Sequence, residues 1–116
     1  VPTMSLDWCA TFREAARVSK APRNSLDGIS LMPLLRGEKG SAARTFHWTF
    51  EDSLVGTPRS FACRRGKWKM LRVGTQMALY DLDRDAGEEH DESAAHPEVL
   101  QRLVRDSAAW AATLPS

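Results

Sequence analysis

The fold is decided by residues 61–88, which read FACRRGKWKMLRVGTQMALYDLDRDAGE. Two strand-like runs meet at Gly66 and Lys67, and a third run ends at Tyr80, before an acidic turn. A two-residue loop that begins with glycine is typical of a tight β-hairpin, because the first loop residue needs a positive φ. We therefore predict an antiparallel hairpin around this loop, continued by a third strand.

Pairing across this loop gives the two strands an apolar face and a mixed face. Cys63 lies opposite Met70, and Phe61 lies opposite Arg72. We expect the apolar face to be packed, with Trp68 as the anchor of its core, and the mixed face to be largely wet. Lys67 and Lys69 are expected to be dispensable for folding. The apolar face carries Phe61, Cys63, Trp68 and Met70, and the mixed face carries Ser60, Ala62, Arg64, Lys69, Leu71 and Val73.

Two flanking elements complete this part of the chain. Residues 45–50 alternate as in a strand, with Phe46, Trp48 and Phe50 on one face and His47 on the other. A final helix begins at Pro97, since proline suits the first helical position. We predict an α+β fold: a roughly four-stranded antiparallel sheet with the C-terminal helix packed on one face, plus an N-terminal helix. The stripe predicted to be buried on the final helix is Leu100, Leu103, Ser107, Trp110 and Leu114.

The N-terminal helix is predicted over residues 4–17, with Ser5 as its cap and Asp7 in its first turn. An apolar stripe at helical spacing is expected to face a core. Residues 26–37 then form a turn and a short apolar helical turn that ends at Gly37. A charged linker follows, so we divide the chain into residues 1–37 and residues 45–116. The stripe is Met4, Trp8, Phe12, Ala15 and Ala16.

Composition excludes several classes of protein. The chain has 116 residues, 42% hydrophobic and 27% charged, as in a folded globular domain. Its net charge of +1 gives no general attraction to nucleic acid or to acidic membranes. No apolar run approaches the roughly 20 residues of a membrane helix. No secretory signal is visible, and the sequence does not assign the protein to a cellular compartment. Cys9 and Cys63 are expected to be buried, reduced thiols, with a disulfide as the weaker alternative.

Two motifs suggest binding sites. Asp81, Asp83, Asp85 and Glu92 have the spacing of an EF-hand calcium loop, but alanine occupies the sixth place, where that loop needs glycine. A strand rather than a helix also precedes the loop, so the sequence favours a solvated acidic turn. The three histidines lack metal-ligand spacing. We name two candidates for lining a substrate pocket, His47 on a strand and Arg59 in the following loop.

Several blocks together resemble the C-terminal end of type I sulfatases, which belong to the alkaline-phosphatase superfamily. The family commonly has a basic-Gly-x-Trp-Lys strand, a Leu-Tyr-Asp-Leu strand and an Asp-Pro-x-Glu turn; residues 64–71, 79–82 and 85–88 read RRGKWKML, LYDL and DAGE. Residues 6–12 (LDWCATF) and 26–37 (LDGISLMPLLRG) resemble its Met-Asp-x-x-Pro-Thr-Leu helix and Leu-Asp-Gly-x-Ser-Leu segment. Alanine replaces proline in two of these blocks. The resemblance covers nearly the whole chain in the family's order.

This resemblance implies a C-terminal fragment of a sulfuric ester hydrolase. In that family the nucleophile is a hydrated formylglycine, assisted by a divalent cation, usually calcium. Those residues are expected upstream of Val1. Residues 9–13 (CATFR) approach the formylglycine motif Cys/Ser-x-Pro/Ala-x-Arg, but Thr11 occupies its third place and the block lies at the wrong end of a sulfatase. We therefore expect no catalytic and no metal-binding residue here.

The resemblance also implies a partner, the missing N-terminal sulfatase core, against which this non-catalytic module packs and whose substrate cleft it borders. Without the core, the chain should expose the Trp8 and Phe12 face or bury it by self-association. The alternative is a free-standing protein-interaction or calcium-binding module that uses the acidic turn 81–92. Such a module should be a stable monomer in which this face is covered.

Overall fold

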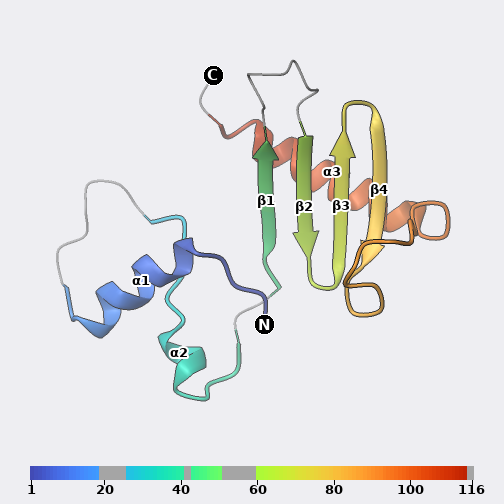
Figure 1. The fold of residues 1–116 in the computed structure, drawn as a ribbon. Helices are drawn as coiled ribbons and strands as arrows, with labels where there is room; N and C mark the ends of the chain where they lie inside the picture. The colour runs from blue at the N-terminus through green and yellow to red at the C-terminus, as the bar shows by residue number, and fades with distance from the viewer. Residues whose placement is uncertain (19–25, 41–42, 51–59, 115–116) are drawn as a thin grey trace. The chain divides into compact units, whose positions relative to one another are not determined.

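The computed structural model describes residues 1–18, 26–40, 43–50 and 60–114 (Figure 1). The chain divides into two compact units, Val1–Ala42 and Ala43–Ser116. Each unit is described by itself below.

The second unit is a four-stranded antiparallel sheet with one long helix. Its strands follow each other in the order β1-β2-β3-β4, and Figure 1 shows α3 running across one face of the sheet. The predicted α+β fold is confirmed. The elements are β1 (Thr45–Phe50), β2 (Ser60–Arg65), β3 (Trp68–Val73), β4 (Gln76–Asp81) and α3 (Pro97–Ala111).

The central hairpin has the predicted register. Cys63 is paired with Met70 across β2 and β3, and Gly66 has a φ of 59°. A second loop of the same kind joins β3 to β4, where Gly74 has a φ of 60°. The sequence therefore contains two Gly-x hairpin loops, and both need the left-handed backbone that glycine adopts without strain.

The core lies between the sheet and α3. Cys63, Met70, Leu79 and Leu103 are at most 1% exposed. Trp68 is only partly buried and packs at the edge of this cluster, with its ring centroid 4.8 Å from that of His96. Its assignment as the anchor of the core was wrong, because the first residue of β3 lies beside the start of α3 rather than under its middle.

The end of α3 also differs from the prediction. The helix ends at Ala111, and Leu114 beyond it is 44% exposed. Leu103 and Ser107 are the buried residues of the helix. The predicted stripe is therefore too long by one turn.

The first unit contains α1 (Leu6–Ala15) and the short α2 (Met32–Leu35). The buried residues of α1 are Asp7 and Thr11, whereas Trp8 is 44% and Phe12 63% exposed. The expectation that the apolar stripe faces a core is thus wrong for this structure. Ser5 makes no side-chain cap; instead, the Met4 amide donates to Asp7 Oδ2 at 2.9 Å.

Candidate functional site

A polar clamp within the first unit explains part of the sequence pattern. The Ile29 amide donates to Asp7 Oδ1 at 3.0 Å, and the Leu31 amide donates to Thr11 Oγ1 at 2.8 Å. The Thr11 hydroxyl in turn donates to the Asp7 carbonyl at 2.7 Å. A Cβ on Gly28 would lie 2.2 Å from the Leu6 carbonyl oxygen, so only glycine fits there. We call Asp7, Thr11 and Gly28 the α1 clamp; it fixes residues 29–31 on α1.

The clamp leaves the aromatic side of α1 open. The Trp8 and Phe12 rings stack, with centroids 5.6 Å apart and an angle of 28° between their planes. Cys9 is exposed as well, which corrects the expectation of a buried thiol. Cys63 is buried as expected, and both cysteines are free. An exposed pair of large aromatic side chains is a surface suited to packing against another protein.

The sheet face opposite α3 is hollowed beside the acidic turn. The register places Phe46, Trp48 and Phe50 on this face, because His47 is paired with Cys63 and therefore points toward α3. A hollow of about 510 Å³ opens there, which we call the opposite-face hollow. Its lining residues are Trp48, Phe50, Ala62, Arg64, Lys69, Leu82, Ala86 and Glu88.

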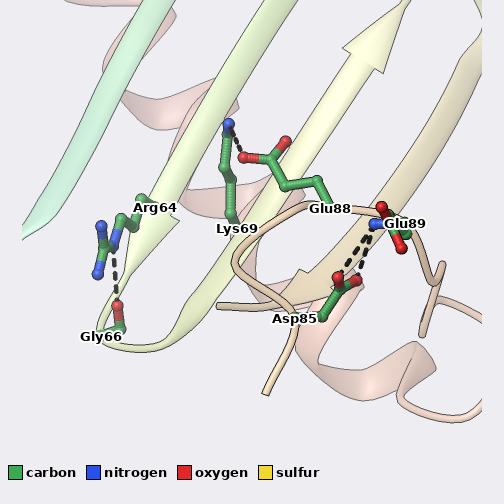
Figure 2. A network of polar contacts seen from close by, with 6 residues as sticks. All are labelled: Arg64, Gly66, Lys69, Asp85, Glu88 and Glu89. Atoms are coloured by element: carbon green, nitrogen blue, oxygen red, sulfur yellow. Dashed lines mark hydrogen bonds and ion pairs between the residues drawn. The ribbon is translucent and has the colours of Figure 1, made fainter. Parts of the chain in front are cut away.

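Charged side chains form one side of this hollow. Figure 2 shows the Lys69 ammonium group meeting the Glu88 carboxylate, while the Arg64 Nε donates to the Gly66 carbonyl at 3.1 Å. Glu88 has a φ of 56°, and Asp85 holds the turn by accepting the Glu89 amide at 2.9 Å. The hollow thus combines an aromatic wall with an ion pair and the cationic Arg64. Such a surface can stack on a ring and attract an anionic group.

The carboxylates of the acidic turn bind backbone amides and two lysines, Lys67 and the Lys69 described above. Lys67 Nζ lies 2.6 Å from Asp81 Oδ2, and this hydrogen bond is the main reason that the pKa of Asp81 lies below its ordinary value. The His90 amide, followed by the Glu89 amide, lowers the pKa of Asp85. Asp91 accepts the Leu79 amide at 3.0 Å and the Ser93 amide at 2.8 Å. The turn is therefore held by its own carboxylates.

The ion pair between Lys67 and Asp81 revises the expectation for Lys67. Lys67 is a partner of the nearly buried Asp81 carboxylate, so its removal should disturb the turn, contrary to its assignment as dispensable.

Within the described ranges, no three His, Cys, Asp or Glu side chains are placed to hold a metal ion together.

His47 lies beneath α3. Its ring stacks on Trp110, with centroids 4.8 Å apart and an angle of 6°. Its Nδ1 atom is buried and has no hydrogen-bond partner among the residues described. Burial lowers the pKa of His47, and Asp106 opposes this effect. Arg59 lies outside the described residues. His47 and Arg59 both remain predictions as pocket residues. The sequence did not indicate Arg64 as a lining residue, because the opposite-face hollow forms only where the acidic turn folds over the sheet.

Comparisons with known proteins give a consistent picture. No protein-family model and no curated protein sequence matches the chain. Among solved structures, Ps i-CgsB in complex with k-i-k-neocarrahexaose matches 94% of this chain, with a TM-score of 0.79 and 23% identity. BT1596, described as a 2-O GAG sulfatase, matches 94% at a TM-score of 0.61 and 26% identity. BT4656, solved with D-glucosamine-2-N,6-O-disulfate, matches 85% of this chain at a TM-score of 0.69 and 18% identity.

The chain spans about a quarter of the length of these proteins, between 22% and 26%. BT1596 is described as a sulfatase, and so is a further neighbour from Bacteroides thetaiotaomicron, at 26% identity and a TM-score of 0.63. The resemblance to sulfatases found in the sequence is confirmed. In the described part of the chain, no helix has the length and apolar character needed to cross a membrane.

Proposed function

We propose that this chain is the C-terminal region of a sulfuric ester hydrolase and that its own role is non-catalytic. The observation that carries the proposal is the stacked Trp8 and Phe12 pair, 44% and 63% exposed, in a chain that matches only about a quarter of each sulfatase. Exposed aromatic surface of this kind is unfavourable in water and favours a partner. We infer that the partner is the N-terminal catalytic core of the same protein.

The opposite-face hollow is the surface that we propose to border the substrate cleft. Trp48 and Phe50 offer a wall for a sugar ring, and Arg64 offers a cation for a sulfate group. A sulfated saccharide is the substrate class that fits this chemistry, and two structural neighbours were solved with a saccharide bound. Arg64 joins Arg59 as a proposed residue of this cleft surface. His47 faces α3, on the other side of the sheet, and stays a separate prediction.

The catalytic groups of the parent protein are proposed to lie outside this chain. Formylglycine would supply the nucleophile, and a divalent cation such as calcium would polarise the sulfate. The residues present here do not fit those groups. Thr11 occupies the motif position where proline or alanine is needed and serves the α1 clamp. The carboxylates of the acidic turn bind Lys67, Lys69 and backbone amides. We derive no catalytic step from this chain.

A turnover assay tests the non-catalytic role. Purified 116-residue chain should hydrolyse an aryl sulfate no faster than buffer. Turnover that disappears in Cys9→Ala would overturn the proposal and restore a formylglycine at that position. Cys9 is exposed, so this substitution should leave the fold intact.

Self-association tests the docking face. The isolated chain should form concentration-dependent oligomers in sedimentation velocity, and Trp8→Ser with Phe12→Ser should return it to a monomer. Leu114→Ser is the matched control, because Leu114 is as exposed as Trp8, at 44%, but belongs to the second unit rather than to α1. A wild-type chain that stays monomeric at high concentration would favour the free-standing module instead.

A further inference from the structure

A second, smaller hollow lies on the α3 side of the sheet, away from the opposite-face hollow. Its volume is about 150 Å³, and it opens where the last turns of α3 pass over β2, β3 and β4. We call it the α3 pocket. Cavities of this volume in other proteins hold one six-membered ring. The lining residues are Phe61, Met70, Arg72, Met77, Val104, Ser107, Ala108 and Ala111.

The walls of the α3 pocket are apolar except at two places. Ser107 is 7% exposed, and its hydroxyl oxygen has no hydrogen-bond partner among the residues described. Burial raises the pKa of the nearby Cys63 thiol, so this thiol stays protonated at neutral pH. A thiol is only a weak partner, and the two groups do not reach hydrogen-bonding geometry. A buried hydroxyl without a partner is unfavourable, so a ligand that meets it gains affinity.

The second polar place is Arg72, the only charged residue among the lining residues. Its Nε donates to the Gly74 carbonyl at 2.9 Å, which holds the guanidinium near the β3–β4 loop. The strand register places Arg72 between Phe61 and Met77. A cation set between two apolar side chains at an open pocket suits an anion attached to an apolar group.

We propose that the α3 pocket binds a small aromatic carboxylate that carries a ring hydroxyl. The ring fills the apolar volume, the carboxylate pairs with Arg72, and the hydroxyl meets Ser107. The orientation follows from charge: Ser107 and Ala111 lie in the last turns of α3, where the negative end of the helix dipole disfavours an anion. The carboxylate therefore lies on the sheet side. This site is independent of the sulfatase proposal.

Calorimetric titration of the 116-residue chain with 4-hydroxyphenylacetate and with phenylacetate tests the site. Both should bind saturably. Ser107→Ala should weaken 4-hydroxyphenylacetate about 2- to 10-fold, the value of one neutral hydrogen bond, and leave phenylacetate unchanged. Arg72→Met should weaken both ligands about 10-fold or more, as expected for a charged hydrogen bond.

Two further variants separate the pocket from general effects. Ala108→Leu, at an exposed position, should fill the pocket and abolish binding of both ligands without disturbing the core. Arg64→Met removes a cation from the opposite face, outside the lining of the α3 pocket, and should leave the affinity for both ligands unchanged. Amide NMR spectra establish that each variant is folded. The proposal is overturned if neither ligand binds saturably, if Arg64→Met weakens binding as much as Arg72→Met, or if Ser107→Ala affects both ligands equally.

Discussion

Replacing Gly28 with alanine should release residues 29–31 from α1. The added Cβ would lie 2.2 Å from the Leu6 carbonyl oxygen and 2.8 Å from the Asp7 amide nitrogen. Both neighbours are backbone atoms and cannot rotate away, so the segment has to move by about 0.8 Å to reach 3.0 Å, below which Cβ contacts are essentially never found. A shift of that size takes the 3.0 Å bond from Ile29 to Asp7 out of hydrogen-bonding range.

The cost follows from the bonds that are lost. The Ile29 bond to Asp7 and the Leu31 bond to Thr11 are long-range bonds of the α1 clamp, and leaving such buried groups unpaired costs about 1–3 kcal/mol each. We therefore expect the loss of both bonds in Gly28→Ala to destabilise the first unit by about 2–6 kcal/mol.

Amide hydrogen exchange measures this at the residues concerned. The Ile29 and Leu31 amides should lose most of their protection in Gly28→Ala. Gly40→Ala is the matched control, because its new Cβ meets only flexible side chains, the nearest being Val1 at 2.9 Å. Unchanged protection of both amides in Gly28→Ala would refute the clamp.

Three further predictions concern the sheet unit. Leu103→Ala, at a site 1% exposed, should cost about 2–5 kcal/mol in urea unfolding, and a change within about 0.5 kcal/mol would contradict the assigned core. Because burial lowers the folded-state pKa of His47, the free energy of unfolding should fall as the pH drops through the ordinary histidine pKa of 6.5. His47→Phe should reduce this pH dependence of stability, and an unchanged pH dependence would contradict the buried position of His47. In Lys67→Met, NMR titration should show the pKa of Asp81 rising toward 3.8, whereas Lys69→Met should leave it unchanged. The ionised Asp81 stabilises the fold above pH 3.8, and this stabilisation is lost as the pH falls through the lowered pKa. Lys67→Met should therefore make the free energy of unfolding less dependent on pH in this acidic range.

The strand faces were predictable because they depend on local rules. A two-residue loop fixes the register, and a side-chain period of two then assigns each face, as Cys63 opposite Met70 confirms. The central position of the core was not predictable in this way. It depends on where α3 crosses the sheet, and the crossing puts Leu79 and Leu103, rather than Trp68, at its middle.

The orientation of α1 shows a second limit of the sequence. Hydrophobic periodicity assigns Trp8 and Phe12 to a buried face, whereas the helix buries Asp7 and Thr11, each one position away. One position is about 100° around a helix. The buried pair binds the backbone at Ile29 and Leu31, 22 and 20 residues away in sequence. Periodicity detects an apolar face but does not tell whether the chain itself or a partner covers it.

The docking claim is tested most directly by binding between the two proposed parts of one sulfatase. The proposed N-terminal sulfatase core would be produced without this region, and its aryl sulfate turnover would be measured with and without the added 116-residue chain. Our account predicts that the wild-type chain raises turnover in a saturable manner, whereas the chain carrying Trp8→Ser and Phe12→Ser does not. Turnover that is unaffected by the wild-type chain, or equally increased by both chains, would contradict the proposed docking through α1.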